Sequence, residues 1–168
     1  KWWDSDGDGT NDQSVTDVTV LNADGSRTET IKATTLNAAQ TAFVRLSSST
    51  TVTSASGQTS TTSMDTDGDG KTDRIRTFTT LQNADGSAQE TMADTTVAGV
   101  LLDRQVTTTS ADGRTLSISR DADGDGHVDQ SVVNVKAIDG SAVSTTSDYS
   151  RTGLLLDRAT RTVSVDGL

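Results

Sequence analysis

Cysteine and proline are absent from this 168-residue chain, and aromatic residues make up only 3 % of it. Without cysteine the chain forms no disulfide, thiolate zinc site or cysteine nucleophile. No apolar run approaches the roughly 18 residues of a membrane-spanning helix, so membrane insertion is not expected. Basic residues are also few, because 14 Lys and Arg stand against 24 acidic residues, for a formal charge of −10. Nucleic acid is therefore not an expected partner.

Large apolar residues are scarce as well. Leu, Ile, Val and Phe number 32 in total, a share of about 19 %, which is common in disordered chains. Two features argue against disorder. Thr and Ser together number 51, and threonine favours strands. The acidic residues comprise 22 Asp but only two Glu, and this bias is typical of turns and metal-binding loops rather than of disorder.

An acidic motif, D-x-D-G-D-G-x-x-D, occurs three times, at residues 4–12, 65–73 and 121–129. Internal similarity of this kind indicates a repeat protein. We therefore expect three repeat units, comprising residues 1–64, 65–120 and an incomplete 121–168. The phase of the markers predicts a piece of a longer array, with a natural C-terminus as the alternative.

Between the acidic motifs, Asp-Gly turns separate segments of roughly eight to ten residues that are rich in Thr and Val, as strands are. Asp-Gly between such segments is a hairpin signal. Alternation at residues 18–20 and 133–135 predicts one buried and one solvated face. We expect an all-β fold, an elongated array of antiparallel four-stranded repeat units linked by the acidic loops; a compact β-sandwich or a propeller fragment is the alternative. Only residues 37–44 suggest a short helical turn.

The acidic motif has the spacing of a calcium loop. Carboxylates at positions 1, 3, 5 and 9 converge if the chain winds tightly, glycine at position 6 permits the turn, and position 7 offers its carbonyl oxygen. Position 12, where an EF-hand has its bidentate Glu, is Val15, Arg76 or Val132. The Asp at position 9 is therefore expected to be the bidentate ligand. Magnesium favours fewer carboxylates, and zinc favours His or Cys, of which the chain has one His.

We thus predict about three Ca²⁺ ions per chain and no other cofactor. The predicted ligands are Asp4, Asp6, Asp8, Thr10, Asp12, Asp65, Asp67, Asp69, Lys71, Asp73, Asp121, Asp123, Asp125, His127 and Asp129. Thr10, Lys71 and His127 occupy position 7, so their side chains are expected to point outward. An acidic surface turn without metal is the alternative, but twelve crowded carboxylates would repel one another strongly.

The D-x-D-G-D-G-x-x-D loops resemble those of thrombospondin type 3 repeats and of integrin α-chain propeller blades. The whole unit, with its N-A-D-G-S and L-x-D-R markers, is similar to the repeat arrays of very large secreted bacterial calcium-binding proteins, which often carry RTX nonapeptides and leave by type I secretion. This resemblance implies an extracellular or cell-surface location and a stalk, adhesin or matrix role. Tandem G-G-x-G-x-D-x nonapeptides are absent, so a parallel β-roll is not expected.

Other residues favour structural roles. Glu29 and Glu90 lie on equivalent strands of different units and form no expected catalytic pair. Trp2 and Trp3 are expected to cap a thin core, with stacking on sugars as the alternative. The leucines at 101–102 and 154–156 are expected to form the densest core of each unit, or else a sticky edge.

No nucleophile–base pair is recognisable, so the sequence predicts a non-catalytic protein. Its expected partners are neighbouring repeats of the same chain, with identical chains or cell-surface glycans as further candidates. The alternatives to a calcium-stiffened segment are a fibre-forming subunit and a polysaccharide-binding module of a larger secreted protein.

Overall fold

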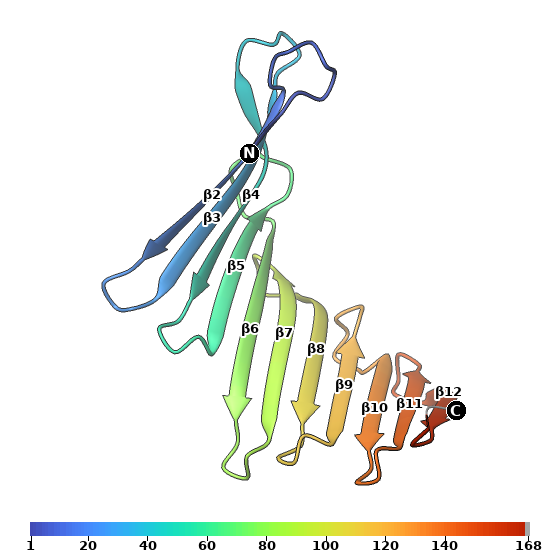
Figure 1. Cartoon of the computed structure of the whole chain (residues 1–168). Helices are drawn as coiled ribbons and strands as arrows, with labels where there is room; N and C mark the ends of the chain where they lie inside the picture. The colour runs from blue at the N-terminus through green and yellow to red at the C-terminus, as the bar shows by residue number, and fades with distance from the viewer. Residues whose placement is uncertain (167–168) are drawn as a thin grey trace. The chain divides into compact units, whose positions relative to one another are not determined.

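The computed structural model describes residues 1–166 and is all-β (Figure 1), as the sequence predicts. The chain divides into two compact units, Lys1–Thr77 and Phe78–Leu168. No helix occurs among residues 1–166, so none of sufficient length and apolarity to span a membrane is found there. The predicted division into three repeats remains a prediction, and the units are described separately below.

Twelve strands make up the described chain. Unit 1 contains β1 (Trp2–Trp3), β2 (Gln13–Leu21), β3 (Arg27–Leu36), β4 (Phe43–Thr53) and β5 (Thr59–Asp65). Strand β6 (Arg74–Gln82) includes the boundary between the units. Unit 2 contains β7 (Ala88–Thr96), β8 (Leu101–Thr109), β9 (Thr115–Asp121), β10 (Gln130–Lys136), β11 (Ala142–Tyr149) and β12 (Leu155–Val163).

Within each unit, consecutive strands pair antiparallel with their neighbours in chain order. Short Asp-Gly turns follow β2, β6, β8 and β10. In the turn after β2, the Asn22 N–H bonds to the Ser26 carbonyl at 2.8 Å, and Asp24 accepts from both the Ser26 N–H and its hydroxyl. Gly25 has a φ of 82°, a value that glycine adopts without strain. The hairpins predicted from Asp-Gly are thus confirmed.

Strands β4, β8 and β12 each carry a β-bulge. The register shifts between β3 and β4, between β7 and β8, and between β11 and β12. In each case one leucine of the second strand has no partner opposite it, namely Leu46, Leu102 and Leu156. The extra residue bends its strand locally. The bulges of β4 and β8 each lie against one of the acidic loops.

The prediction of one buried face is wrong, because no hydrophobic residue is buried in the described chain. Val18 pairs with Thr30 and the adjacent Asp17 pairs with Ile31, so Val18 and Ile31 lie on opposite faces, and both are exposed. Apolar residues are thus divided between two faces of a single layer in each unit, and neither unit is a β-sandwich. The buried residues are all polar: Ser14, Ser26, Asp65, Asp94, Asp121 and Ser147.

Three further expectations are corrected. The leucines form no core, since Leu102 is 37 % exposed and Leu156 is 69 % exposed; these two are the bulge residues of β8 and β12. Trp2 and Trp3 cap no core and are exposed, although the Trp2 ring packs edge-on against Phe43 with centroids 5.3 Å apart. Residues 37–44 form a turn followed by the start of β4, without a helix.

Candidate metal-binding loops

Each acidic motif forms a long loop, called here loop 1 (residues 4–12), loop 2 (65–73) and loop 3 (121–129). The N–H of the last Asp in each loop donates to the carbonyl of the residue just before the loop. These closing bonds are Asp12 to Trp3 at 2.7 Å, Asp73 to Met64 at 2.8 Å and Asp129 to Arg120 at 2.8 Å. Both ends of each loop are thereby fixed to its flanking backbone.

The first Asp of each loop organises the turn. In loop 1, Asp4 accepts the Gly7 N–H on Oδ1 at 2.6 Å and the Gly9 N–H on Oδ2 at 2.9 Å. Asp65 and Asp121 accept the same two glycine N–H groups of their own loops at 2.7 to 3.0 Å. The sequence therefore folds all three loops with the same backbone path.

The remaining Asp residues each commit one oxygen to the backbone. At positions 3 and 5 the carboxylate accepts the N–H two residues ahead, as in Asp6 with Asp8 at 3.1 Å and Asp8 with Thr10 at 2.7 Å. The position 9 carboxylate accepts on Oδ2 from the N–H of position 2, which for Asp12 is Ser5 at 2.7 Å. The second oxygen of each of these carboxylates is not used by these backbone bonds, although in loops 2 and 3 some of these oxygens contact a Lys or Arg side chain.

Carboxylates converge in every loop. One oxygen from each of three Asp residues lies within 4.8 Å of the other two in each of three clusters. The clusters are Asp4, Asp6 and Asp8 in loop 1; Asp65, Asp67 and Asp73 in loop 2; and Asp121, Asp123 and Asp129 in loop 3. Asp12, Asp69 and Asp125 are in the same loops but outside the clusters. Of the twelve predicted carboxylate ligands, the structure therefore brings nine together.

Position 7 differs in side chain but not in backbone role. Thr10, Lys71 and His127 each donate their N–H to the Asp at position 5, at 2.7 to 2.8 Å. All three residues are exposed, as expected for side chains that point outward, but the Lys71 ammonium turns back to Asp69 of its own loop. His127 thus has no special position in loop 3.

Hydrogen bonds lower the pKa of the last Asp in two loops. The Ser5 hydroxyl and N–H lower the pKa of Asp12, and the Thr66 N–H and hydroxyl lower that of Asp73. These carboxyls therefore remain ionised at and below neutral pH. An ionised carboxylate is the form that binds a hard cation.

Asp65 is the most enclosed carboxylate of loop 2, with 6 % exposure. Burial raises the pKa of Asp65. The Gly68 N–H, the Arg45 guanidinium and the Gly70 N–H together lower it by more, so the net pKa lies below the ordinary value. Arg45, on β4, approaches Asp65 at 3.2 Å. A buried carboxylate is therefore kept charged by three donors.

Positive side chains reach two of the loops. Lys71 contacts Asp69 of its own loop at 3.1 Å, and this pairing raises the pKa of Lys71. Arg151, in the turn after β11, contacts Asp123 at 3.0 Å and Asp125 at 3.5 Å in loop 3. Within the described residues, no ion pair reaches loop 1. Loop 1 is thus the site with least internal compensation of its charge.

Sequence analysis did not single out Arg45 or Arg151. Each lies 20 or more residues from the carboxylate that it contacts, so only the strand register brings them together. One sequence signal exists for Arg151. It lies four residues before the L-L-D-R segment of β12, whereas the residue four before the L-L-D-R segment of β8 is Val97.

The three clusters offer hard carboxylate oxygens and include no nitrogen or sulfur atom, which is chemistry suited to a hard divalent cation such as Ca²⁺. No protein-family model, curated protein or solved structure matches this chain.

Proposed function

We propose that this chain is a non-catalytic calcium-binding repeat segment that becomes rigid when Ca²⁺ occupies its three loops. The observation that carries the proposal is the shared hydrogen-bond scaffold, which aims three carboxylates at one point in each loop. The finer architecture, four-stranded repeat units joined by the calcium loops, is part of this proposal.

The loop scaffold supports metal binding because it fixes the carboxylates before an ion arrives. N–H groups bind one oxygen of the position 3 Asp in every loop, and so orient the other oxygen. Such preorganisation reduces the entropy lost on binding. Charge also supports metal binding. The carboxylates of each cluster lie within 4.8 Å of one another and repel, and a bound cation would remove this repulsion.

The choice of calcium rests on ligand type and number. The three clustered Asp of each loop, joined by the fourth Asp and the position 7 carbonyl, would supply at least five oxygen atoms, and Ca²⁺ takes six to eight with water. Mg²⁺ demands a tighter octahedral shell and retains more of its own water. Binding of three Ca²⁺ ions would change the formal net charge from −10 to −4.

The dependence of stability on calcium follows from the absence of an apolar core. With no buried hydrophobic residue in residues 1–166, hydrophobic burial contributes less here than in a globular domain. Calcium supplies a compensating term: at a tenfold excess over Kd each site contributes about 1.4 kcal/mol, and three sites together about 4 kcal/mol. This is comparable with the stability of a small domain.

The biological role proposed is that of an extracellular stalk, adhesin or matrix segment, kept flexible at low cytosolic calcium and stiffened at the cell surface. Support comes from the resemblance of the loops to those of secreted calcium-binding arrays. Calcium sites of extracellular modules typically have Kd values of about 0.1 to 1 mM, a range that suits a switch between cytosolic and external calcium.

The test is thermal unfolding followed by circular dichroism in EGTA, in millimolar CaCl₂ and in MgCl₂, with the number of bound ions measured by calorimetry. We expect a cooperative transition that Ca²⁺ raises and Mg²⁺ does not, with about three ions per chain. The matched variant combines Asp6→Asn, Asp67→Asn and Asp123→Asn, which retain side-chain shape and remove one carboxylate from each cluster. A calcium-independent melting temperature in the wild-type chain would refute the proposal.

A further inference from the structure

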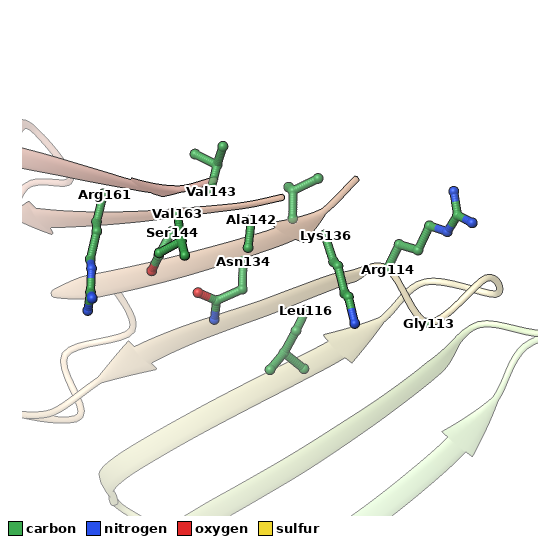
Figure 2. Close-up of a pocket in the computed structure, with 11 residues that line it drawn as sticks. Gly113, Arg114, Leu116, Asn134, Lys136, Ala142, Val143, Ser144, Arg161 and Val163 are labelled. Carbon is green, nitrogen blue, oxygen red and sulfur yellow. The ribbon is translucent and has the colours of Figure 1, made fainter. Parts of the chain in front are cut away.

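A groove of about 360 Å³ lies on one face of β9–β12 in unit 2 (Figure 2). Residues directly opposite one another in an antiparallel sheet share a face, and the register places Leu116, Asn134, Ser144 and Arg161 in one row across the four strands. Lys136, Ala142 and Val163 form the next row. The groove is at the ends of β9 and β10 opposite to loop 3, so it is separate from the metal site.

Three cationic side chains line this groove, namely Arg114, Lys136 and Arg161, and no carboxylate does. In residues 1–166 neither Lys136 nor Arg161 forms a side-chain hydrogen bond or ion pair. Arg114 has Asp112 nearby, whose pKa it helps to lower after the Ser110 hydroxyl and the Arg114 N–H. In a chain with a net charge of −10, Lys136 and Arg161 are thus two neighbouring positive charges without an acidic partner in the described residues.

The charges are specific to this part of the chain. Lys136 follows the last Asp of loop 3 by seven residues, and the residues at the same distance from loops 2 and 1 are Thr80 and Thr19. Arg161 follows the L-L-D-R segment of β12 by three residues, where β8 has Thr107. Threonine is therefore sufficient for the strand at these positions. The presence of Lys136 and Arg161 there indicates a role beyond strand formation.

We propose that this groove binds an acidic polysaccharide through its carboxylate groups. Lys136 and Arg161 lie two strands and one row apart, about 12 Å at the usual strand spacing and rise, so they can bind two carboxylates of one linear chain. Guanidinium and ammonium groups form their strongest hydrogen bonds with such anions. Asn134 and Ser144 offer polar atoms for sugar hydroxyls, and Leu116 and Val163 offer apolar contact for the C–H face of a sugar ring.

A saccharide fits better than a peptide. Strands β10 and β11 are each paired on both sides, so their backbone groups are already bonded within the sheet. An extended peptide gains most of its affinity from a free strand edge, which the floor of this groove does not provide. The acidic loops of a second copy are the other source of carboxylates, but under the proposed function those carboxylates bind Ca²⁺ in millimolar calcium.

The experiment measures binding of fluorescently labelled oligogalacturonate to the full chain in millimolar calcium, by anisotropy. We expect saturable binding that weakens with salt. The double variant Lys136→Thr and Arg161→Thr, which installs the counterpart residues, should weaken binding by roughly tenfold or more, because two charge-assisted contacts are lost.

The matched control is Arg27→Ala with Lys32→Ala, which removes the same charge from exposed positions of β3 whose counterparts are Ala88 and Ala93. It should bind as the wild type does, and circular dichroism checks that both variants are folded. Equal binding by the groove variant and the wild type would overturn the proposal. Loss of binding only in the Asp6, Asp67 and Asp123 variant would also overturn it, by assigning the uronate to loop-bound calcium. Tighter binding of labelled poly-glutamate would overturn it in favour of an acidic peptide.

Discussion

Gly68 of loop 2 lies directly against the backbone of Arg45 on β4. A Cβ atom added to Gly68 would come within 2.3 Å of the Arg45 carbonyl oxygen, closer than such atoms approach in proteins. Arg45 adjoins Leu46, the bulge residue of β4. Gly124 of loop 3 has the same relationship to Leu101, beside the bulge residue Leu102. Loops 2 and 3 are thus each seated on the bulge of an earlier strand, and the site geometry depends on that contact.

The first prediction concerns this close approach. Gly68 and Gly7 occupy the same position in their loops, with φ values of 80° and 79°, but nothing lies within 4 Å of a Cβ built on Gly7. Gly7→Ala should therefore cost only the left-handed backbone penalty of about 1 to 2 kcal/mol. Gly68→Ala should cost a further 1 to 3 kcal/mol or so from overpacking. Urea unfolding in calcium measures both, and equal losses would show that the loop leaves the bulge without cost.

Local structure was largely predictable from the sequence, because turns and strands depend on short-range chemistry. The turn at residues 22–26 follows from Asn, Asp and Gly at fixed positions, and the same holds at 83–87. Burial was not predictable in this way. Alternation in β2 places Val18 and Val20 on one face, but the face that receives a partner layer is a tertiary property, and here both residues remain more than half exposed.

The candidate site likewise has a part that was predictable from the sequence and a part that was not. The convergence of Asp65 and Asp67 is local, since it follows from the spacing and from glycine at positions 4 and 6. The approach of Arg151 to Asp123 depends on the pairing of β10 with β11 and on the turn beyond. No spacing rule connects those two residues, so only the structure shows that loop 3 carries an internal cation.

The second prediction concerns acid. The Ser87 hydroxyl and N–H lower the pKa of Asp85 below its ordinary value of 3.8. A carboxyl whose pKa is lower in the folded state stabilises the fold above its unfolded pKa, and this contribution is lost as pH falls through the folded pKa. In EGTA, the melting temperature should thus be constant near neutrality and fall below about pH 3.8, the unfolded reference. Ser87→Ala should raise the pKa of Asp85 in an NMR titration, and an unchanged value would contradict the assignment.

The third prediction concerns Arg151, whose guanidinium neutralises part of loop 3. Arg151→Val, which installs the residue found at 97, should tighten calcium binding to loop 3 by roughly two- to fivefold, a modest effect because the side chain is 76 % exposed. Calorimetry in a background of Asp6→Asn and Asp67→Asn isolates this loop. Lys32→Ala serves as the charge control. If Arg151 instead orders the loop, its replacement will weaken binding.

The last prediction uses the two tryptophans of the chain, Trp2 and Trp3, which immediately precede loop 1. The Asp12 N–H bonds to the Trp3 carbonyl at 2.7 Å, and the Trp2 ring packs at 73° against Phe43. Ordering of loop 1 by calcium should therefore fix both indoles and shift their emission to shorter wavelength. Asp6→Asn should abolish this shift, whereas Asp123→Asn, the matching change in loop 3, should leave it intact. Because only loop 1 adjoins these indoles, a shift lost equally in both variants would mean that the loops bind calcium as one cooperative unit rather than as separate sites.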